Sequence, residues 1–231
     1  MSLLYGRILK PAGPLPRIVA VDYGMGNLGS VKNAIEMLGY EVEVSGDPAR
    51  IAQADALVLP GVGAFGRAMD NLRDRRLIGP LARRVMEERA PFLGICLGMQ
   101  LLFEDSLEGG RHAGLGWLPG HVLPFDPTTL DRVPHVGWSP VHGRESSLFA
   151  NLDRAACFYF DHSYYLECPT EIAAAVCDAG GLSFTAAVHA DNVFATQFHP
   201  EKSQRAGLRL LRNFTDYCRA RFQQAPSESA A

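Results

Sequence analysis

The sequence contains no long hydrophobic run, no excess of one charge and no closely spaced cysteines. None of its apolar stretches approaches the roughly 18 residues that a membrane-spanning helix needs. Its first residues, MSLLYGRILKPAGPLPR, have neither a long apolar core nor a small-residue cleavage site. A net charge of -3 argues against the basic surface of a nucleic-acid-binding protein. We therefore expect a cytoplasmic protein with no membrane and no nucleic-acid partner.

The cysteines are too scattered for a disulfide framework or a zinc site. There are five, an odd number, and no two of them have the C-x-x-C spacing of common zinc and redox motifs. Free cysteines of this kind fit a reducing compartment.

What the sequence does contain is a repeated strand, turn and helix pattern in its first half. Strand-like runs at 17–22 and 56–60 each lead into a glycine-rich turn and a helical pattern, and a further strand-like run lies at 41–44. Asn27 is a suitable cap for the first helix, 27–38. The alternation predicts an α/β fold of flavodoxin-like type, with an open, mostly parallel sheet and helices on both faces.

From about residue 105 the pattern changes to shorter strand-like pieces separated by Gly and Pro, around a loop PHVGWSP. These pieces predict additional antiparallel strands in the C-terminal half, followed by a helix over 203–222. Prolines in residues 1–16 predict a flexible N-terminal arm. We expect one domain over 17–222 and a disordered tail over 223–231.

The most informative stretch is FLGICLGMQLLF, residues 92–103, where a strand-like run meets a helix-like run. Cys96 lies at the join, with Gly94 and Gly98 on either side, which matches a nucleophile elbow with cysteine in place of serine. The first turn of the following helix favours a thiolate at this position. The alternative is a buried free cysteine at a strand–helix corner.

A cysteine nucleophile needs a base and a group that orients the base. In VFATQFHPEKS, residues 193–203, a strand-like run ends at His199, and Glu201 follows two positions later. Strand periodicity would place both side chains on one side. The alternative is a surface His-Pro-Glu turn. Two other histidines, His135 and His162, lie in aromatic stretches and are either ligand contacts or core residues.

Two glycine patterns resemble dinucleotide fingerprints, namely Gly24, Gly26 and Gly29, with Asp47 downstream, and Gly61, Gly63 and Gly66. One nucleotide does not need two fingerprints on separate strands, so tight loops at the strand ends explain both patterns better. The second loop is placed to form an oxyanion hole. We expect its donors to be the Leu97 N–H and an N–H of Gly61 or Val62.

With GICLGMQ around Cys96 and QFHPEKS around His199 and Glu201, the chain resembles the class I glutamine amidotransferases over residues 17–222. Three further stretches, DYGMGN at 22–27, PHVGW at 134–138 and YFDHSYY at 159–165, resemble the glutaminase subunits of imidazole glycerol phosphate synthase in histidine biosynthesis.

The resemblance implies hydrolysis of glutamine to glutamate and ammonia, with no metal and no organic cofactor. It implies a partner cyclase subunit of (β/α)8-barrel fold, which receives the ammonia and makes imidazole glycerol phosphate. It assigns Cys96 as nucleophile, His199 as base and acid, and Glu201 as the residue that orients His199. The remaining residues implied are substrate contacts and partner-facing positions: Gln100, Glu108, Ser163 and Tyr164 for glutamine, and Asn27, Trp138 and Lys202 for the cyclase.

The sequence departs from the family pattern at Asp161, where an apolar residue is usual, and at Ser139, where Asn is expected. Both departures concern the predicted partner interface. Three alternatives remain: a glutaminase or related cysteine hydrolase serving another reaction, a catalytically silent regulatory subunit, and a nucleotide-binding protein. The intact Cys, His and Glu favour catalysis.

Overall fold

A computed structural model describes residues 11–128, 130, 132–144 and 146–224 of the protein. Most of the predicted N-terminal arm and tail, residues 1–10 and 225–231, therefore lies outside the described residues. Within this part of the chain no helix is both long and apolar enough to cross a membrane.

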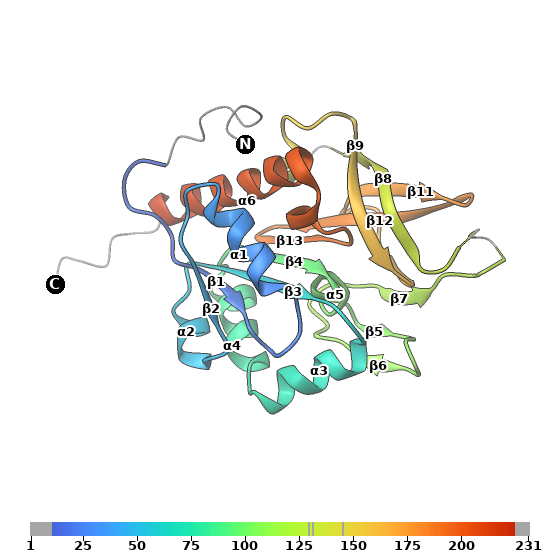
Figure 1. Cartoon of the computed structure of the whole chain (residues 1–231). Helices are drawn as coiled ribbons and strands as arrows, with labels where there is room; N and C mark the ends of the chain where they lie inside the picture. Colours follow the sequence, from blue (N-terminus) through green and yellow to red (C-terminus); the bar gives the residue numbers. More distant parts are fainter. Residues whose placement is uncertain (1–10, 129, 131, 145, 225–231) are drawn as a thin grey trace.

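The helices alternate with strands in the first half of the chain, and one long helix ends it (Figure 1). They are α1 (Leu28–Glu36), α2 (Pro48–Ala52), α3 (Phe65–Asp74), α4 (Ile78–Ala82), α5 (Leu97–Gln100) and α6 (Gln204–Gln224). Three further helical segments are the π-helical η1 (Arg83–Glu87) and the 3-10 turns η2 (Ser147–Phe149) and η3 (Pro200–Lys202).

Thirteen strands form one mixed sheet. In the first half these are β1 (Ile18–Val21), β2 (Val42–Ser45), β3 (Ala56–Gly61), β4 (Phe92–Cys96), β5 (Asp105–Ser106), β6 (His112–Ala113) and β7 (His121–Pro124). The second half adds β8 (His135–Gly143), β9 (Ala155–His162), β10 (Tyr164–Glu167), β11 (Ala173–Ala179), β12 (Leu182–Ala190) and β13 (Val193–Thr196).

The strand order β2-β1-β3-β4-β13 is parallel throughout, as in flavodoxin-like folds. Beyond β13 the sheet continues through β12, β10 and β7, and β11, β8 and β9 branch from β12 as antiparallel strands. This confirms the predicted α/β fold with its parallel sheet and its antiparallel strands in the C-terminal half.

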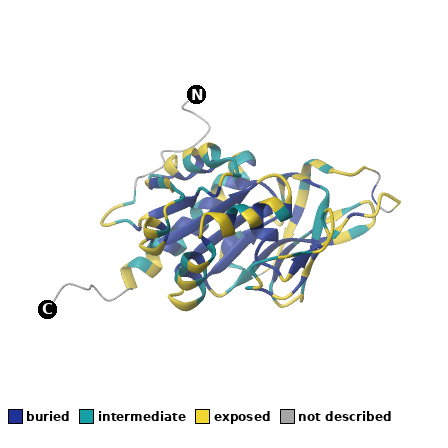
Figure 2. Ribbon diagram, turned by 90° about the horizontal axis from the view of Figure 1, so that it is seen from below, coloured by how far each residue is buried: buried dark blue, intermediate teal, exposed yellow. Residues whose placement is uncertain are grey.

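Helices cover the parallel part of the sheet on both faces, because its strands are apolar on both sides. Alternate residues of β1 point to opposite faces: Ile18 and Ala20 belong to the core under α1 and α6, and Val19 and Val21 to the core over α3 and α4. Figure 2 shows the buried strands between helices whose outer surfaces are exposed.

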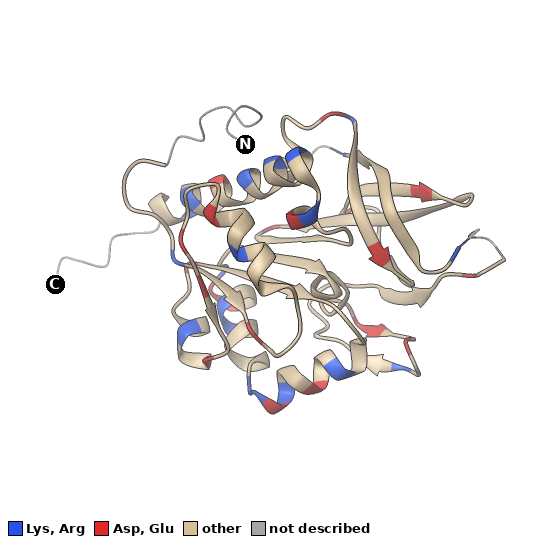
Figure 3. Ribbon diagram, in the orientation of Figure 1, with Lys and Arg blue, Asp and Glu red and all other residues tan. Residues whose placement is uncertain are grey.

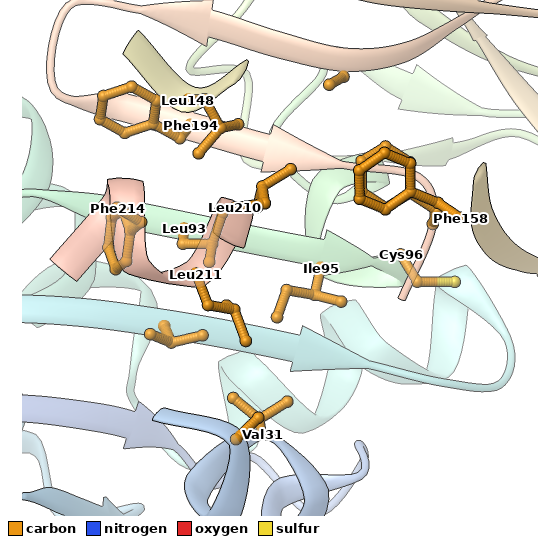
Figure 4. Packing of buried hydrophobic residues seen from close by; sticks show 14 of the residues in the cluster. Val31, Leu93, Ile95, Cys96, Leu148, Phe158, Phe194, Leu210, Leu211 and Phe214 are labelled. Carbon is orange, nitrogen blue, oxygen red and sulfur yellow. The ribbon is translucent and has the colours of Figure 1, made fainter. Parts of the chain in front are cut away.

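The long helix α6 shields the strand that carries Cys96. Leu210 and Phe214 of α6 pack in the same cluster as Leu93 and Ile95 of β4, and Cys96 lies at the end of this strand (Figure 4). The arginines of α6 lie along its outer surface in Figure 3, as expected for a solvated face.

Three sequence predictions about elements were wrong. PHVGWSP is not a loop but most of β8, because it pairs along its length with β9. The run 193–196 is not only an antiparallel strand, since β13 also pairs in parallel with β4. The tail does not begin at 223, because α6 continues to Gln224.

The predicted arm also differs in the part that the structure describes. Leu15 packs against the main core and Pro16 is buried, so apolar contacts fix the end of this segment to the domain. Helix α2 was not predicted, although Asp47 and Pro48 are typical start signals. The Asp47 carboxylate accepts a hydrogen bond from the Ala49 N–H at 2.9 Å, so this residue is a helix cap.

Candidate active site

Cys96 lies at a strained turn between β4 and α5. Its backbone has φ 54° and ψ -110°, a left-handed conformation that is costly for a residue with a side chain. The predicted tight turn is therefore present. Such strain persists only where surrounding structure enforces it, and it is typical of active-site nucleophiles.

The two glycines beside Cys96 are required by the packing of this turn. A Cβ on Gly98 would lie 1.8 Å from the Leu59 carbonyl oxygen, and a Cβ on Gly94 would lie 2.7 Å from the Gly98 carbonyl oxygen. Both contacts involve backbone atoms, which cannot move aside as a side chain can. The glycines thus allow β3, β4 and α5 to approach closely enough to hold Cys96 in its turn.

The parallel pairing of β13 with β4 brings His199 to the cysteine. Ile95 of β4 pairs with Thr196 of β13, so the carboxyl ends of both strands meet at the same edge of the sheet. His199 Nδ1 lies 2.8 Å from Glu201 Oε1, and the two side chains are 3% and 1% exposed. The proximity does not come from strand periodicity, as predicted, but from the 3-10 turn η3 that starts at Pro200.

The imidazole of His199 has a raised pKa. Burial by itself lowers the pKa of this imidazole, but its interactions with Cys96 and Glu201 outweigh burial and raise the pKa to about 9. Because Nδ1 faces Glu201, Nε2 is the ring nitrogen left for the thiol. An imidazole in this state readily accepts the proton of a thiol.

Gln197 also contacts the nucleophile, and the sequence analysis did not identify it. Its Nε2 donates to Cys96 Sγ at 3.8 Å, while its Oε1 accepts from Gln100 Nε2 at 3.0 Å. Gln197 is fully buried. It directly follows β13, two residues before His199, and no pattern in the local sequence marks it as a contact of Cys96.

Cys96 and His199 open into a pocket of about 360 Å³. Its lining consists of residues from both halves of the sheet: Val62, Gly63, Cys96, Leu97, Gln100, Glu108, Pro134, Asp161, His162, Ser163, Tyr164 and His199. All four predicted substrate contacts therefore line it. Gly61 and Glu201 are not among the lining residues, since Gly61 pairs with Cys96 in the sheet and Glu201 contacts His199.

A larger groove of about 930 Å³ lies elsewhere, along β2 and the segment before β1. Lys32, Glu36, Tyr40 and Arg50 are among its lining residues, and the lining includes neither a cysteine nor a histidine. The smaller pocket is therefore the better candidate, because it holds the nucleophile and its base.

Leu97 and Val62, two of the residues predicted to form an oxyanion hole, line the pocket together with Cys96. Leu97 starts α5 directly after the cysteine, and Val62 directly follows β3. Val62 is 41% exposed, so this loop lies at the pocket opening. Binding of one oxygen atom by both N–H groups stays a prediction.

Glu108 links the pocket to the helix that follows this loop. Its Oε2 accepts a hydrogen bond from the Phe65 N–H at 2.8 Å, at the start of α3. Ala64 precedes that helix and offers no side-chain cap, so Glu108 caps α3 from a distant segment. Gln100 Nε2 also donates to the Tyr164 carbonyl at 3.2 Å, which leaves Gln100 Oε1 for a ligand.

His162 lines the pocket as a neutral residue. Its Nδ1 donates to the Tyr164 carbonyl oxygen at 2.8 Å, and burial lowers its pKa to about 3. Its Nε2 is buried and has no hydrogen-bond partner within the described ranges. His162 also packs against Phe125 and Phe184, as expected for a core residue, and its contact with a ligand stays a prediction.

The predicted partner-facing residues lie outside the pocket. Trp138 is 47% exposed on β8, and its ring packs edge to face against Tyr159. Lys202 Nζ lies 5.4 Å from the centre of the Tyr159 ring. The Asn27 side chain accepts from the Ser30 N–H at 3.4 Å and so caps α1, as expected.

No cluster of three or more His, Cys, Asp or Glu residues among those described has an arrangement that could hold a metal ion. The pocket offers a thiol and a basic imidazole for chemistry.

Comparison with known proteins agrees with this chemistry. The family described as "Glutamine amidotransferase class-I" matches residues 19–217. The chain is 49% identical over 205 residues to "Imidazole glycerol phosphate synthase subunit HisH" of Syntrophotalea carbinolica, covering 86% of this chain and 99% of that one. It is 49% identical over 203 residues to "Imidazole glycerol phosphate synthase subunit HisH 2" of Vibrio vulnificus, covering 87% and 94%.

Solved structures share the fold. A putative GMP synthase protein from Thermoplasma acidophilum has a TM-score of 0.68 at 20% identity, covering 92% of this chain and 98% of that chain. The structure of PurLQS from Thermotoga maritima has a TM-score of 0.68 at 19% identity, covering 88% and 99%.

Proposed function

Because the chain belongs to the class I glutamine amidotransferase family, we propose that its pocket hydrolyses glutamine with Cys96 as the nucleophile. Its similarity to HisH subunits over most of its length identifies it as the glutaminase subunit of imidazole glycerol phosphate synthase, in histidine biosynthesis. The single observation that best supports Cys96 as the nucleophile is its strained backbone beside a histidine that is paired with a buried carboxylate.

The reaction starts with transfer of the thiol proton from Cys96 to His199 Nε2. The sulfur then attacks the side-chain amide carbon of glutamine, and the amide oxygen becomes an oxyanion. The N–H groups of Leu97 and Val62 stabilise this oxyanion. Glu201 keeps His199 in orientation and stabilises its protonated form.

His199 next gives its proton to the leaving nitrogen, which departs as ammonia and leaves a γ-glutamyl thioester on Cys96. Water attacks the thioester carbon while His199 accepts a proton from it. The proton returns to the sulfur, and glutamate is released. The free enzyme is restored with one glutamine and one water consumed.

The charged ends of glutamine bind at the end of the pocket away from Cys96. Glu108 offers a carboxylate to the α-ammonium group, and Gln100 Oε1 offers a second acceptor. Ser163 and Tyr164 line the same pocket, where they hold the α-carboxylate and the substrate chain. This arrangement selects an amino acid with a side-chain amide.

The partner is a (β/α)8-barrel cyclase that forms a heterodimer with the chain and receives the ammonia directly. Exposed Val136 and Trp138 on β8, with Lys202 beside Tyr159, support an apolar docking surface with a cation next to the pocket. Asn27 is assigned to the same interface. Direct transfer to the cyclase protects ammonia from protonation and loss.

The test is ammonia release from glutamine by the chain alone, with the cyclase, and with the cyclase and its nucleotide ligand. We expect turnover in the complete assembly. Absence of turnover in that assembly would contradict the proposal, whereas turnover only with a different synthase partner would support a glutaminase of another reaction.

A further inference from the structure

The hydroxyl of Tyr23 is a buried polar group without a hydrogen-bond partner in the part of the chain that the structure describes. Tyr23 follows β1 in the first glycine-rich turn and is 0% exposed. Buried polar groups in native proteins are nearly always hydrogen-bonded, so an unpaired one calls for an explanation. A role in a second state of the protein is one such explanation.

This hydroxyl lies directly behind the oxyanion loop. A Cβ on Gly61 would lie 2.5 Å from the Tyr23 hydroxyl and 2.8 Å from the Gly98 nitrogen. Gly61 in turn pairs with Cys96 across β3 and β4. Since Tyr23 is fully buried and is not among the pocket-lining residues, it faces Gly61 from the protein side of the loop.

The glycine-rich turn that contains Tyr23 also packs against Pro60, the residue before Gly61. A Cβ on Gly26 would lie 3.0 Å from the Pro60 carbonyl oxygen, so the turn packs closely against the end of β3. Burial, with a smaller contribution from nearby Cys96, raises the pKa of Tyr23. The hydroxyl therefore keeps its proton and is available as a donor.

We propose that Tyr23 is a positioning residue for the oxyanion loop, whose hydroxyl donates to the Gly61 carbonyl while the Val62 N–H binds the oxyanion of the reacting glutamine. In a trans peptide the N–H and C=O groups point in opposite directions. When the Val62 N–H points into the pocket, the Gly61 carbonyl points towards the protein interior, where Tyr23 lies. The role rests on the proposed glutaminase function.

This role predicts opposite effects on activity and on stability. Tyr23→Phe removes an unpaired buried hydroxyl from the resting protein, so the melting temperature should stay equal or rise. In the catalytic state the same change removes a hydrogen bond that holds the loop. We expect kcat to fall about tenfold and KM to change by less than about twofold, because the loss affects the transition state and not substrate binding.

The experiment measures ammonia release by wild type, Tyr23→Phe and Tyr40→Phe, each assembled with the cyclase and its nucleotide ligand. Tyr40 is a matched control, because it is also buried but bonds Asp216 of α6 at 3.4 Å, away from the pocket. The alkylation rate of Cys96 by iodoacetamide is measured in parallel. Alkylation is a displacement without an oxyanion, so it reports the Cys96 thiol and His199 alone.

The proposal predicts a lower kcat for Tyr23→Phe, an unchanged alkylation rate, an equal or higher melting temperature, and wild-type kcat for Tyr40→Phe. A wild-type kcat for Tyr23→Phe, or a fall in kcat matched by slower alkylation or a lower melting temperature, overturns the positioning role. An inactive wild-type assembly overturns the glutaminase function, and the positioning role with it.

Discussion

The two walls of the pocket hold histidines in opposite states. The catalytic wall, formed by residues at the ends of β4 and β13, holds His199, and its interactions with Cys96 and Glu201 outweigh burial and raise its pKa to about 9. The substrate wall, formed by Asp161–Tyr164, holds His162, and burial lowers its pKa to about 3. Burial lowers the pKa of both rings, and only His199 has partners, Cys96 and Glu201, whose interactions outweigh it.

The two histidines therefore have different roles in the pocket. His199 can accept and return a proton during the reaction. His162 remains neutral, and its bond to the Tyr164 carbonyl oxygen leaves Nε2 as the unprotonated nitrogen. Changes to the catalytic wall should therefore lower kcat, and changes at the substrate end should mainly raise KM.

The largest effect is expected from removal of the nucleophile. Cys96→Ala should lower kcat for ammonia release in the assembly about a thousandfold or more, because no thioester can form. Cys168→Ala is the control, since this cysteine contacts Thr185 outside the pocket. Steady-state assays of both variants would contradict the assignment if Cys96→Ala kept wild-type activity.

Separating His199 from its carboxylate should have the next largest effect. Glu201→Gln removes the charge that stabilises the imidazolium, and we expect kcat to fall about a hundredfold. In the wild type, kcat should decline as pH rises through about 9, where His199 loses its proton. In the variant this decline should begin at lower pH, and a pH–rate profile with an unmoved alkaline limb would be evidence against the pairing.

Replacement of Glu108, which we propose binds glutamine, should have a moderate effect, mainly on KM. Glu108→Gln should raise KM for glutamine about tenfold while largely keeping kcat, because the amide oxygen can still accept from the Phe65 N–H. Glu108→Ala should also lower kcat, since it removes the cap of α3 next to the oxyanion loop. Glu171→Gln, on the exposed surface, is the control for loss of a carboxylate. A wild-type KM for glutamine in Glu108→Gln would show that the carboxylate does not bind substrate.

The smallest effect is expected on the pH dependence of folding stability. The pKa of His162 is about 3 in the folded chain against 6.5 for a free side chain, so its contribution to stability is present above pH 6.5 and is lost as pH falls towards 3. The pKa of His199 is raised, so its contribution is present below pH 6.5 and is lost as pH rises through about 9.

Replacement of His162 should therefore change only the acid side of the stability profile. We expect His162→Gln to reduce the fall in melting temperature between neutral and acidic pH by a few degrees, and to leave the alkaline side unchanged. Thermal melts across this range test it. A variant whose profile falls as steeply in acid as that of the wild type would contradict the assignment.

The sequence alone predicted the parts of the site that depend on local spacing. The elbow at Cys96 is recognisable because Gly94 and Gly98 are close in sequence and are required by steric contacts with the backbone. His199 and Glu201 are recognisable for the same reason, although the turn that joins them was taken for a strand. Alternating strands and helices likewise predicted the parallel sheet.

The remaining parts depend on contacts between distant segments. Gln197 contacts the sulfur because β13 inserts in parallel beside β4, and no local pattern specifies that pairing. Glu108 caps α3 across 43 positions of sequence. The unpaired hydroxyl of Tyr23 is visible only when the packing behind Gly61 is known.

The most direct test of the account is capture of the covalent intermediate. The assembly is quenched with acid during glutamine turnover, and the peptide containing Cys96 is examined by mass spectrometry. The account predicts a γ-glutamyl group on Cys96 in the wild type, in greater amount at the start of turnover than after glutamine is consumed, and none in Cys96→Ala. Rapid glutamine hydrolysis by Cys96→Ala, or a glutamyl group on another residue, would contradict it.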